Sequence, residues 1–135
     1  MDIFQKIFST IEPLLPNGWE EMWYCADYEQ DSYSMRFYVR IGDKINQLSQ
    51  CDGMSQTVVI NKAIEIDKFL APHRNMLSEQ NRWNVLTMVV DNTGHFYVEY
   101  DYTDITDRYF EYIELWEKKY LKNRFGDEKP NTFED

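Results

Sequence analysis

The side chains most able to do chemistry in this sequence are carboxylates gathered in its last third. Residues 93–117 hold seven acidic side chains against one arginine, a net charge of −6. Asp107, Glu111 and Glu114 follow one another at spacings of four and three residues, which places them on one face of a helix. Like charges at these spacings destabilise a helix by about 0.2–0.5 kcal/mol per pair. Such a face either keeps a protein soluble or attracts a basic partner.

The aspartates at the start of this helix also have a local explanation. If Asp104 or Thr106 caps the helix, Asp107 lies in its first turn, where a carboxylate accepts hydrogen bonds from free backbone N–H groups. Asp104 and Asp107 can therefore serve either to stabilise the helix start or to bind a partner, and the sequence leaves both roles open. Asp101 and Glu99 precede them on a predicted strand.

Tyrosines accompany the acidic residues. Tyrosine is frequent at the energetic centres of protein interfaces because it combines apolar area with a hydroxyl. Phe96, Val98, Tyr100 and Tyr102 alternate along a predicted strand and fit packing in the core, so Tyr97 is the candidate aromatic anchor. The tyrosines in or beside acidic segments are Tyr28, Tyr97, Tyr100, Tyr102, Tyr109 and Tyr112.

Metal-binding patterns are weak. His73 and His95 stand 22 residues apart, and neither has a second His or Cys at metal-ligand spacing. The segment from Asp27 resembles the start of a calcium loop. However, Ser32 stands where such a loop needs glycine, and Tyr38 stands where it needs a bidentate glutamate. We therefore expect no metal ion and no cofactor.

Catalytic patterns are equally weak, because the chain has neither a phosphate-binding glycine motif nor a recognisable nucleophile with its base. A Cys25–His95 pair has no local support. We expect no catalytic residues. The alternative is a small cytosolic enzyme, or an adaptor domain of the same fold, with an acid/base site near Asp101 and His95.

Hydrophobic spacing predicts the elements that position these residues. Residues 42–56 are expected to form a loop with room for a short edge strand, and Asp91–Gly94 a turn. The expected order is α-β-β-α-β-β-α, an α+β domain with a four-stranded antiparallel sheet and helices packed on one face. The predicted elements are a helix at 2–15, strands at 22–29 and 33–41, a helix at 57–70 interrupted at Pro72 and continued at 73–80, strands at 83–90 and 96–102, and a helix at about 105–122.

Length and composition limit the function classes. The 135 residues fit a single domain, expected at 1–125, followed by a flexible tail at 126–135. The net charge of −10 argues against binding nucleic acid or an anionic membrane. The absence of a signal peptide and of a disulfide framework predicts a cytoplasmic protein with free thiols. Residues 20–31 form a second acidic segment, with a net charge of −5, so the rest of the chain is nearly neutral.

Several motifs are familiar in order and spacing. The early ones are Trp19-Glu20-Glu21-Met22-Trp23-Tyr24 and Ser34-Met35-Arg36-Phe37-Tyr38-Val39. The more specific ones are Arg82-Trp83-Asn84-Val85-Leu86-Thr87, the run from Asp91-Asn92-Thr93-Gly94 to Tyr100-Asp101-Tyr102, and Trp116-Glu117-Lys118-Lys119-Tyr120-Leu121. Over residues 3–122 the chain resembles the YezG-like immunity protein family. It departs from the family pattern at Pro72 and in the loop at 42–56.

The resemblance implies an antitoxin that binds and blocks a secreted polymorphic or contact-dependent growth inhibition toxin, many of which are nucleases. Its partner is then the C-terminal domain of a cognate toxin, expected to be basic and nuclease-like. An acidic inhibitor suits such a partner because opposite charges steer association. The residues expected to bind this toxin are Tyr97, Glu99, Asp101, Asp104, Asp107, Glu111 and Glu114.

Overall fold

The computed structural model describes residues 2–121, and the tail predicted at 126–135 lies outside that range. The described elements run in the order α-β-β-β-α-β-β-α, which confirms the predicted α+β class. The helices are α1 (Ile3–Ile11), α2 (Gln56–Asn75) and α3 (Tyr109–Tyr120). The strands are β1 (Glu21–Tyr28), β2 (Tyr33–Ile41), β3 (Lys44–Gln47), β4 (Val85–Asp91) and β5 (Phe96–Asp101).

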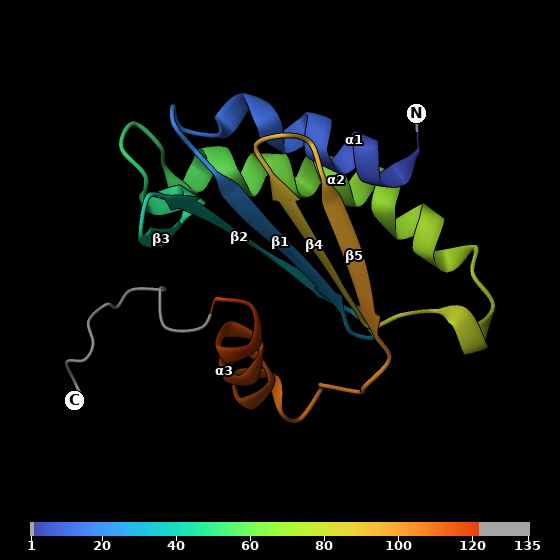
Figure 1. The fold of residues 1–135 in the computed structure, drawn as a ribbon. Helices are drawn as coiled ribbons and strands as arrows, with labels where there is room; N and C mark the ends of the chain where they lie inside the picture. The colour runs from blue at the N-terminus through green and yellow to red at the C-terminus, as the bar shows by residue number, and fades with distance from the viewer. Residues whose placement is uncertain (1, 122–135) are drawn as a thin grey trace.

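The strands form one antiparallel sheet in the order β3-β2-β1-β4-β5 (Figure 1). The described sheet therefore has five strands, one more than the four predicted. The additional strand is β3, which pairs with the end of β2 across a tight turn at Gly42. Gly42 has a φ of +62°, a conformation open to glycine at little cost. A four-residue edge strand is too short to show a clear alternating pattern.

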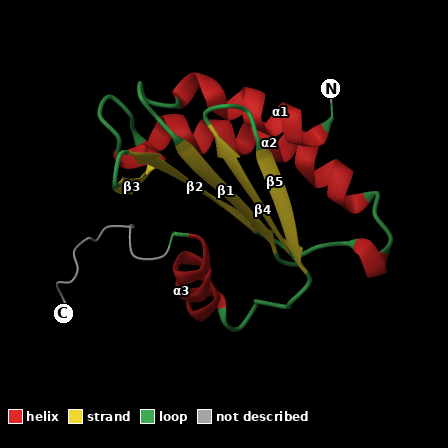
Figure 2. Ribbon diagram, viewed as in Figure 1, coloured by secondary structure: helices red, strands yellow, loops and turns green. Residues whose placement is uncertain are grey.

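The helices cover both faces of the sheet. Helices α1 and α2 lie on one face and α3 on the other (Figures 1 and 2). The prediction that all helices pack on one face is therefore wrong. The reason lies in β1, where neighbouring side chains such as Tyr24 and Cys25 are both fully buried. Successive strand residues point to opposite faces, so each face of β1 needs a cover.

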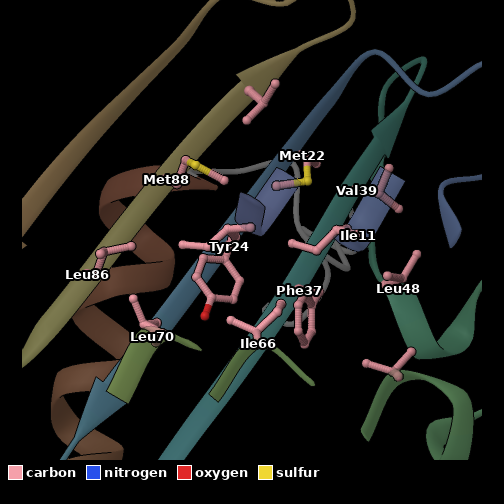
Figure 3. Packing of buried hydrophobic residues seen from close by; sticks show 14 of the residues in the cluster. Ile11, Met22, Tyr24, Phe37, Val39, Leu48, Ile66, Leu70, Leu86 and Met88 are labelled. Atoms are coloured by element: carbon pink, nitrogen blue, oxygen red, sulfur yellow. The ribbon is translucent and has the colours of Figure 1, made fainter. Parts of the chain in front are cut away.

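The main core lies between the sheet and the first two helices. Ile11 of α1, together with Ile66 and Leu70 of α2, packs against alternate residues of β1, β2 and β4 (Figure 3). The stripe of apolar residues predicted for the first helix reaches this core through Ile7 and Ile11. The strand residues drawn in Figure 3 include Met22, Tyr24, Phe37, Val39, Leu86 and Met88.

The sequence predicted the start of α2 more accurately than its end. Ser55 caps the helix, and its hydroxyl oxygen accepts a hydrogen bond from the Val58 N–H at 3.3 Å. The helix continues through Pro72 and ends at Asn75, so the predicted extension to residue 80 is wrong. Pro72 lies in the last turn, where its missing N–H removes one hydrogen bond and the helix stops soon afterwards. Among the described helices, none has the length and apolar character that crossing a membrane requires.

Candidate partner-binding surface

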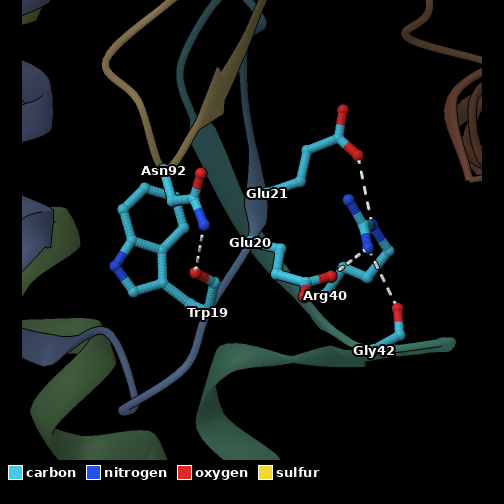
Figure 4. Close-up of polar contacts among 6 residues, drawn as sticks. All are labelled: Trp19, Glu20, Glu21, Arg40, Gly42 and Asn92. Atoms are coloured by element: carbon cyan, nitrogen blue, oxygen red, sulfur yellow. Dashed lines mark hydrogen bonds and ion pairs between the residues drawn. The ribbon is translucent and has the colours of Figure 1, made fainter.

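The first acidic segment, residues 20–31, is partly neutralised within the protein. Arg40 on β2 forms ion pairs with both Glu20 and Glu21, and it also donates a hydrogen bond to the Gly42 carbonyl at 3.0 Å (Figure 4). Asp27 points into the protein and is only 2% exposed. Three of the five carboxylates in this segment are therefore paired or buried, which leaves the second segment as the main acidic surface.

Asp27 belongs to a buried polar group beneath α3. Burial raises the pKa of its carboxyl to about 6, against the opposing effect of Arg36, and its Oδ2 atom has no hydrogen-bond partner among residues 2–121. The Arg36 guanidinium lies 5.1 Å from the Trp116 ring and donates to the Cys25 sulfur at 3.1 Å. Burial raises the pKa of the Cys25 thiol to about 11, which keeps it protonated and unreactive.

The strand β5 carries Tyr97, Glu99 and Asp101 on the face that α3 covers. Their partners on β4 are Val89, Thr87 and Val85, whose side chains lie on that same face. Tyr97 is 52% exposed, as an aromatic anchor would need to be. The structure therefore brings three of the predicted residues together on one face of one strand.

The two carboxylates on β5 already have partners within the chain. Glu99 accepts a hydrogen bond from the Tyr120 hydroxyl and lies 3.5 Å from the Lys119 ammonium. Asp101 accepts from the Tyr112 hydroxyl at 2.8 Å and from the Thr103 N–H at 2.9 Å. The hydrogen bond from Tyr120 lowers the pKa of Glu99. Burial raises the pKa of Asp101, but the hydrogen bonds from Thr103 and Tyr112 outweigh it and lower that pKa.

The remaining predicted carboxylates, at 104, 107, 111 and 114, are all exposed and form no ion pair within residues 2–121. The predicted helix cap at Asp104 or Thr106 is wrong, because α3 begins at Tyr109 and its cap position is Arg108. Asp104 instead accepts a hydrogen bond from the Thr106 N–H at 3.0 Å, which forms a turn before the helix. Only Glu111 and Glu114 therefore stand on α3 itself.

Two exposed apolar residues on α3 were missed by the sequence analysis. Phe110 is 84% exposed and Leu115 is 59% exposed, and both stand on the outer side of the helix with Glu111 and Glu114. The sequence did contain a signal. Both residues fall outside the spacing of the apolar stripe that α3 buries through Tyr112 and its neighbours. Large apolar side chains placed among carboxylates and left in water are typical of an interaction surface.

The geometry gives no support to the alternative acid/base site. His95 precedes β5 and Asp101 ends it, so at about 3.4 Å per residue they stand roughly 20 Å apart. The His95 side chain is 89% exposed, whereas Cys25 is buried, so these two residues do not form a catalytic pair. Within residues 2–121, no group of three or more His, Cys, Asp or Glu side chains is placed to hold a metal ion.

Comparison with known proteins gives the family. The sequence model of the family described as "Immunity protein YezG-like" matches residues 1–132. The chain belongs to this family. The Immunity protein YezG of Bacillus subtilis (strain 168) is 26% identical over 146 residues, covering 98% of this chain and 94% of that protein. The Immunity protein YezG of Bacillus spizizenii is 26% identical over 111 residues, covering 77% of this chain and 69% of that protein.

Membership confirms the resemblance noted in the sequence. It makes the chain an immunity protein and not an enzyme, and an immunity protein implies a cognate toxin as its partner. The site residues then have to be considered as candidates for contact with a toxin.

Proposed function

We propose that this protein binds and neutralises a cognate secreted toxin domain, a basic nuclease, in the cytosol. The proposed contact surface is formed by the outer side of α3, the turn before it and the neighbouring strand β5. It comprises Tyr97, Glu99, Asp101, Asp104, Asp107, Glu111 and Glu114, to which the structure adds Phe110 and Leu115.

One structural observation supports this proposal in addition to family membership. The outer side of α3 presents Phe110 and Leu115 to water together with Glu111 and Glu114, and neither glutamate has an ion-pair partner in the described part of the chain. Exposed aromatic and aliphatic side chains provide area to bury on binding. Carboxylates that are not neutralised attract a basic surface and exclude an acidic one.

The proposed mechanism follows from the charge of nucleases. A nuclease carries basic residues where it holds the phosphate backbone of its substrate. An acidic surface placed on that site would compete with nucleic acid for the same lysines and arginines. Charge attraction of this kind raises association rates by about 10–1,000-fold at low salt, which suits an antitoxin that must act before damage occurs.

Co-expression with the toxin domain encoded beside its gene tests the proposal. We expect growth to be rescued and a stable complex to co-purify. The double reversal Glu111→Lys with Glu114→Lys should slow association by at least tenfold at low salt, because two attractive charges become repulsive. The matched control is Glu12→Lys with Glu65→Lys, which makes the same charge change on exposed residues of the opposite helical layer.

The controls separate the possible failures. No complex and no rescue with the unchanged protein would refute the toxin partnership itself. Equal slowing by both double variants would mean that net charge, and not the α3 surface, governs association. A toxin without nuclease activity would leave the immunity role in place and refute the proposed chemistry of the partner.

A further inference from the structure

A cavity of about 440 Å³ lies between β5 and α3, within the ~300–1,000 Å³ range of typical ligand pockets. Its lining combines negative charge from the strand with aromatic rings from the helix. The residues that matter below are Glu99, Asp101, Tyr112, Trp116, Lys119 and Tyr120.

The carboxylates in this cavity retain capacity for further donors. Glu99 and Asp101 are two residues apart on β5, so they stand on one face about 6.8 Å apart along the strand. Each carboxylate offers about four acceptor positions. The contacts of Glu99 with Tyr120 and Lys119 all fall on its Oε1 atom, which leaves Oε2 with no hydrogen bond from the described residues.

Lys119 of the same chain already places a cationic group against this cavity. Its ammonium lies 3.5 Å from Glu99 Oε1 and 5.1 Å from the centre of the Tyr120 ring. Carboxylate and aromatic face together are the usual surroundings of a bound cation. Lys119 lines the cavity, yet its side chain is 66% exposed, so much of it stays in contact with water. An exposed ion pair of this kind contributes little and is readily exchanged.

We propose that this cavity receives an arginine side chain of the toxin, which displaces Lys119 and bridges Glu99 and Asp101. The inference rests on the proposed function, since the arginine is supplied by the toxin partner. It identifies the cavity as a specific anchor point within the broader acidic surface.

Arginine fits these surroundings better than lysine. Its planar guanidinium has five N–H donors, enough to reach both carboxylates at once, and it stacks on aromatic rings. Tyr120 supplies such a ring, and the buried Trp116 packs against it with the two centroids 4.9 Å apart. Trp116 is held in place by its indole N–H, which donates to the Thr87 hydroxyl at 2.9 Å, so this wall of the cavity is already formed before binding.

Two variants with opposite expected effects test the anchor, with affinity for the toxin domain as the measurement. Glu99→Gln with Asp101→Asn removes both charges but keeps acceptor oxygens for Tyr120 and Tyr112, and should weaken binding by at least 30-fold. Lys119→Met removes the internal competitor and should tighten binding about two- to fivefold. The matched control for the second is Lys68→Met, an exposed lysine on α2 with the same charge change.

The outcomes distinguish this anchor from the proposed function. If the unchanged protein binds no toxin, the proposed function fails first. If it binds, but the carboxylate variant binds equally well or Lys119→Met tightens no more than Lys68→Met, the anchor is refuted while the function stands. The Trp116 indole N–H signal in an NMR spectrum reports whether each variant keeps the cavity wall intact. Should the carboxylate variant fail to fold, Lys119→Met decides alone.

Discussion

Helices α1 and α2 meet one face of the sheet through aliphatic and aromatic side chains, whereas α3 combines a smaller apolar cluster on the other face with hydrogen bonds from hydroxyls and an indole. On the first face, Ile66 and Leu70 are completely buried among apolar neighbours. On the second, Trp116 donates to Thr87, Tyr112 donates to Asp101, and the Tyr38 hydroxyl donates to Glu117 at 3.0 Å. Both faces thus bury apolar side chains, and the second face adds several side-chain hydrogen bonds to α3.

The difference separates the face that contributes most to stability from the face that carries the proposed contact surface. Burial of apolar area is the largest favourable contribution to folding, so the face covered by α1 and α2 supplies most of it. Hydrogen bonds to partly buried carboxylates contribute less, because water still competes for the same groups. The second face, by contrast, has a polar cavity, and Phe110 and Leu115 are exposed on the outer side of α3. We therefore expect that each layer can be disturbed separately.

The largest effect on stability is expected in the apolar layer, which is formed by α1, α2 and the sheet face that they cover. Leu70→Ala should lower the free energy of unfolding by about 2–5 kcal/mol, because it leaves a cavity in a fully buried position. Urea denaturation followed by circular dichroism measures this change. Leu115→Ala makes the same chemical change at an exposed site on α3 and should cost no more than about 0.5 kcal/mol. Equal losses for the two variants would contradict the division between the layers.

The next effect concerns Asp27, whose buried carboxyl has its pKa raised from 3.8 to about 6. Because this folded-state pKa lies above the unfolded one, the contribution of Asp27 to stability is complete below about pH 4. It is lost as pH rises through about 6. Asp27→Asn should therefore gain about 2 kcal/mol relative to the unchanged protein between pH 4 and pH 7, at ~1.4 kcal/mol per pKa unit less some relaxation.

Urea denaturation at several pH values measures that difference. Asp31→Asn is the matched control, since Asp31 is an exposed carboxylate in the turn between β1 and β2. A stability difference between the Asp27 variant and the unchanged protein that stays constant across this pH range would show that Asp27 ionises as freely in the folded state as in the unfolded chain.

A smaller and more local effect is expected for the polar attachment of α3. Tyr112→Phe removes the hydroxyl that donates to Asp101 and should cost about 1 kcal/mol. Amide hydrogen exchange should then accelerate in α3 while the amides of β1 remain protected. If both elements accelerate together, α3 is part of the same cooperative unit as the main core, and the two layers are not separable.

Truncating the two exposed apolar residues of α3 should have the smallest effect on stability and a large effect on toxin binding. Phe110→Ala with Leu115→Ala should leave the free energy of unfolding within about 0.5 kcal/mol of its original value, since both side chains are exposed. The same variant should weaken toxin binding by at least tenfold if these residues are the apolar part of the contact surface. Met76→Ala, at a side chain 85% exposed on another part of the molecule, is the control.

Much of the fold was predictable because periodicity reflects burial. The hairpin of β1 and β2 and the turn ending at Gly94, which has a φ of +95°, were predicted correctly. Errors arose where local preference and tertiary packing disagree. Asp104 was a plausible helix cap by residue type, yet the chain before α3 adopts a separate turn and the helix starts at Tyr109.

The sequence predicted the candidate site only at the level of a region. The sequence placed Glu99 and Asp101 in an acidic segment, but it did not show that their carboxylates accept hydrogen bonds from the α3 residues Tyr120 and Tyr112. These contacts join residues 11 and 21 positions apart, and no local spacing rule relates a strand to a helix beyond a connecting loop. The contact between Lys119 and Glu99 could not be predicted for the same reason.

By itself, the sequence determined the α+β class, the hairpins, the family and the presence of two acidic segments, because these depend on residue type and spacing along the chain. The tertiary structure decided which acidic segment remains available. It paired Glu20 and Glu21 with Arg40 and buried Asp27, while leaving Glu111 and Glu114 in water. Whether a carboxylate is free depends on which distant cation it meets and how much water reaches it, and both are properties of the folded chain.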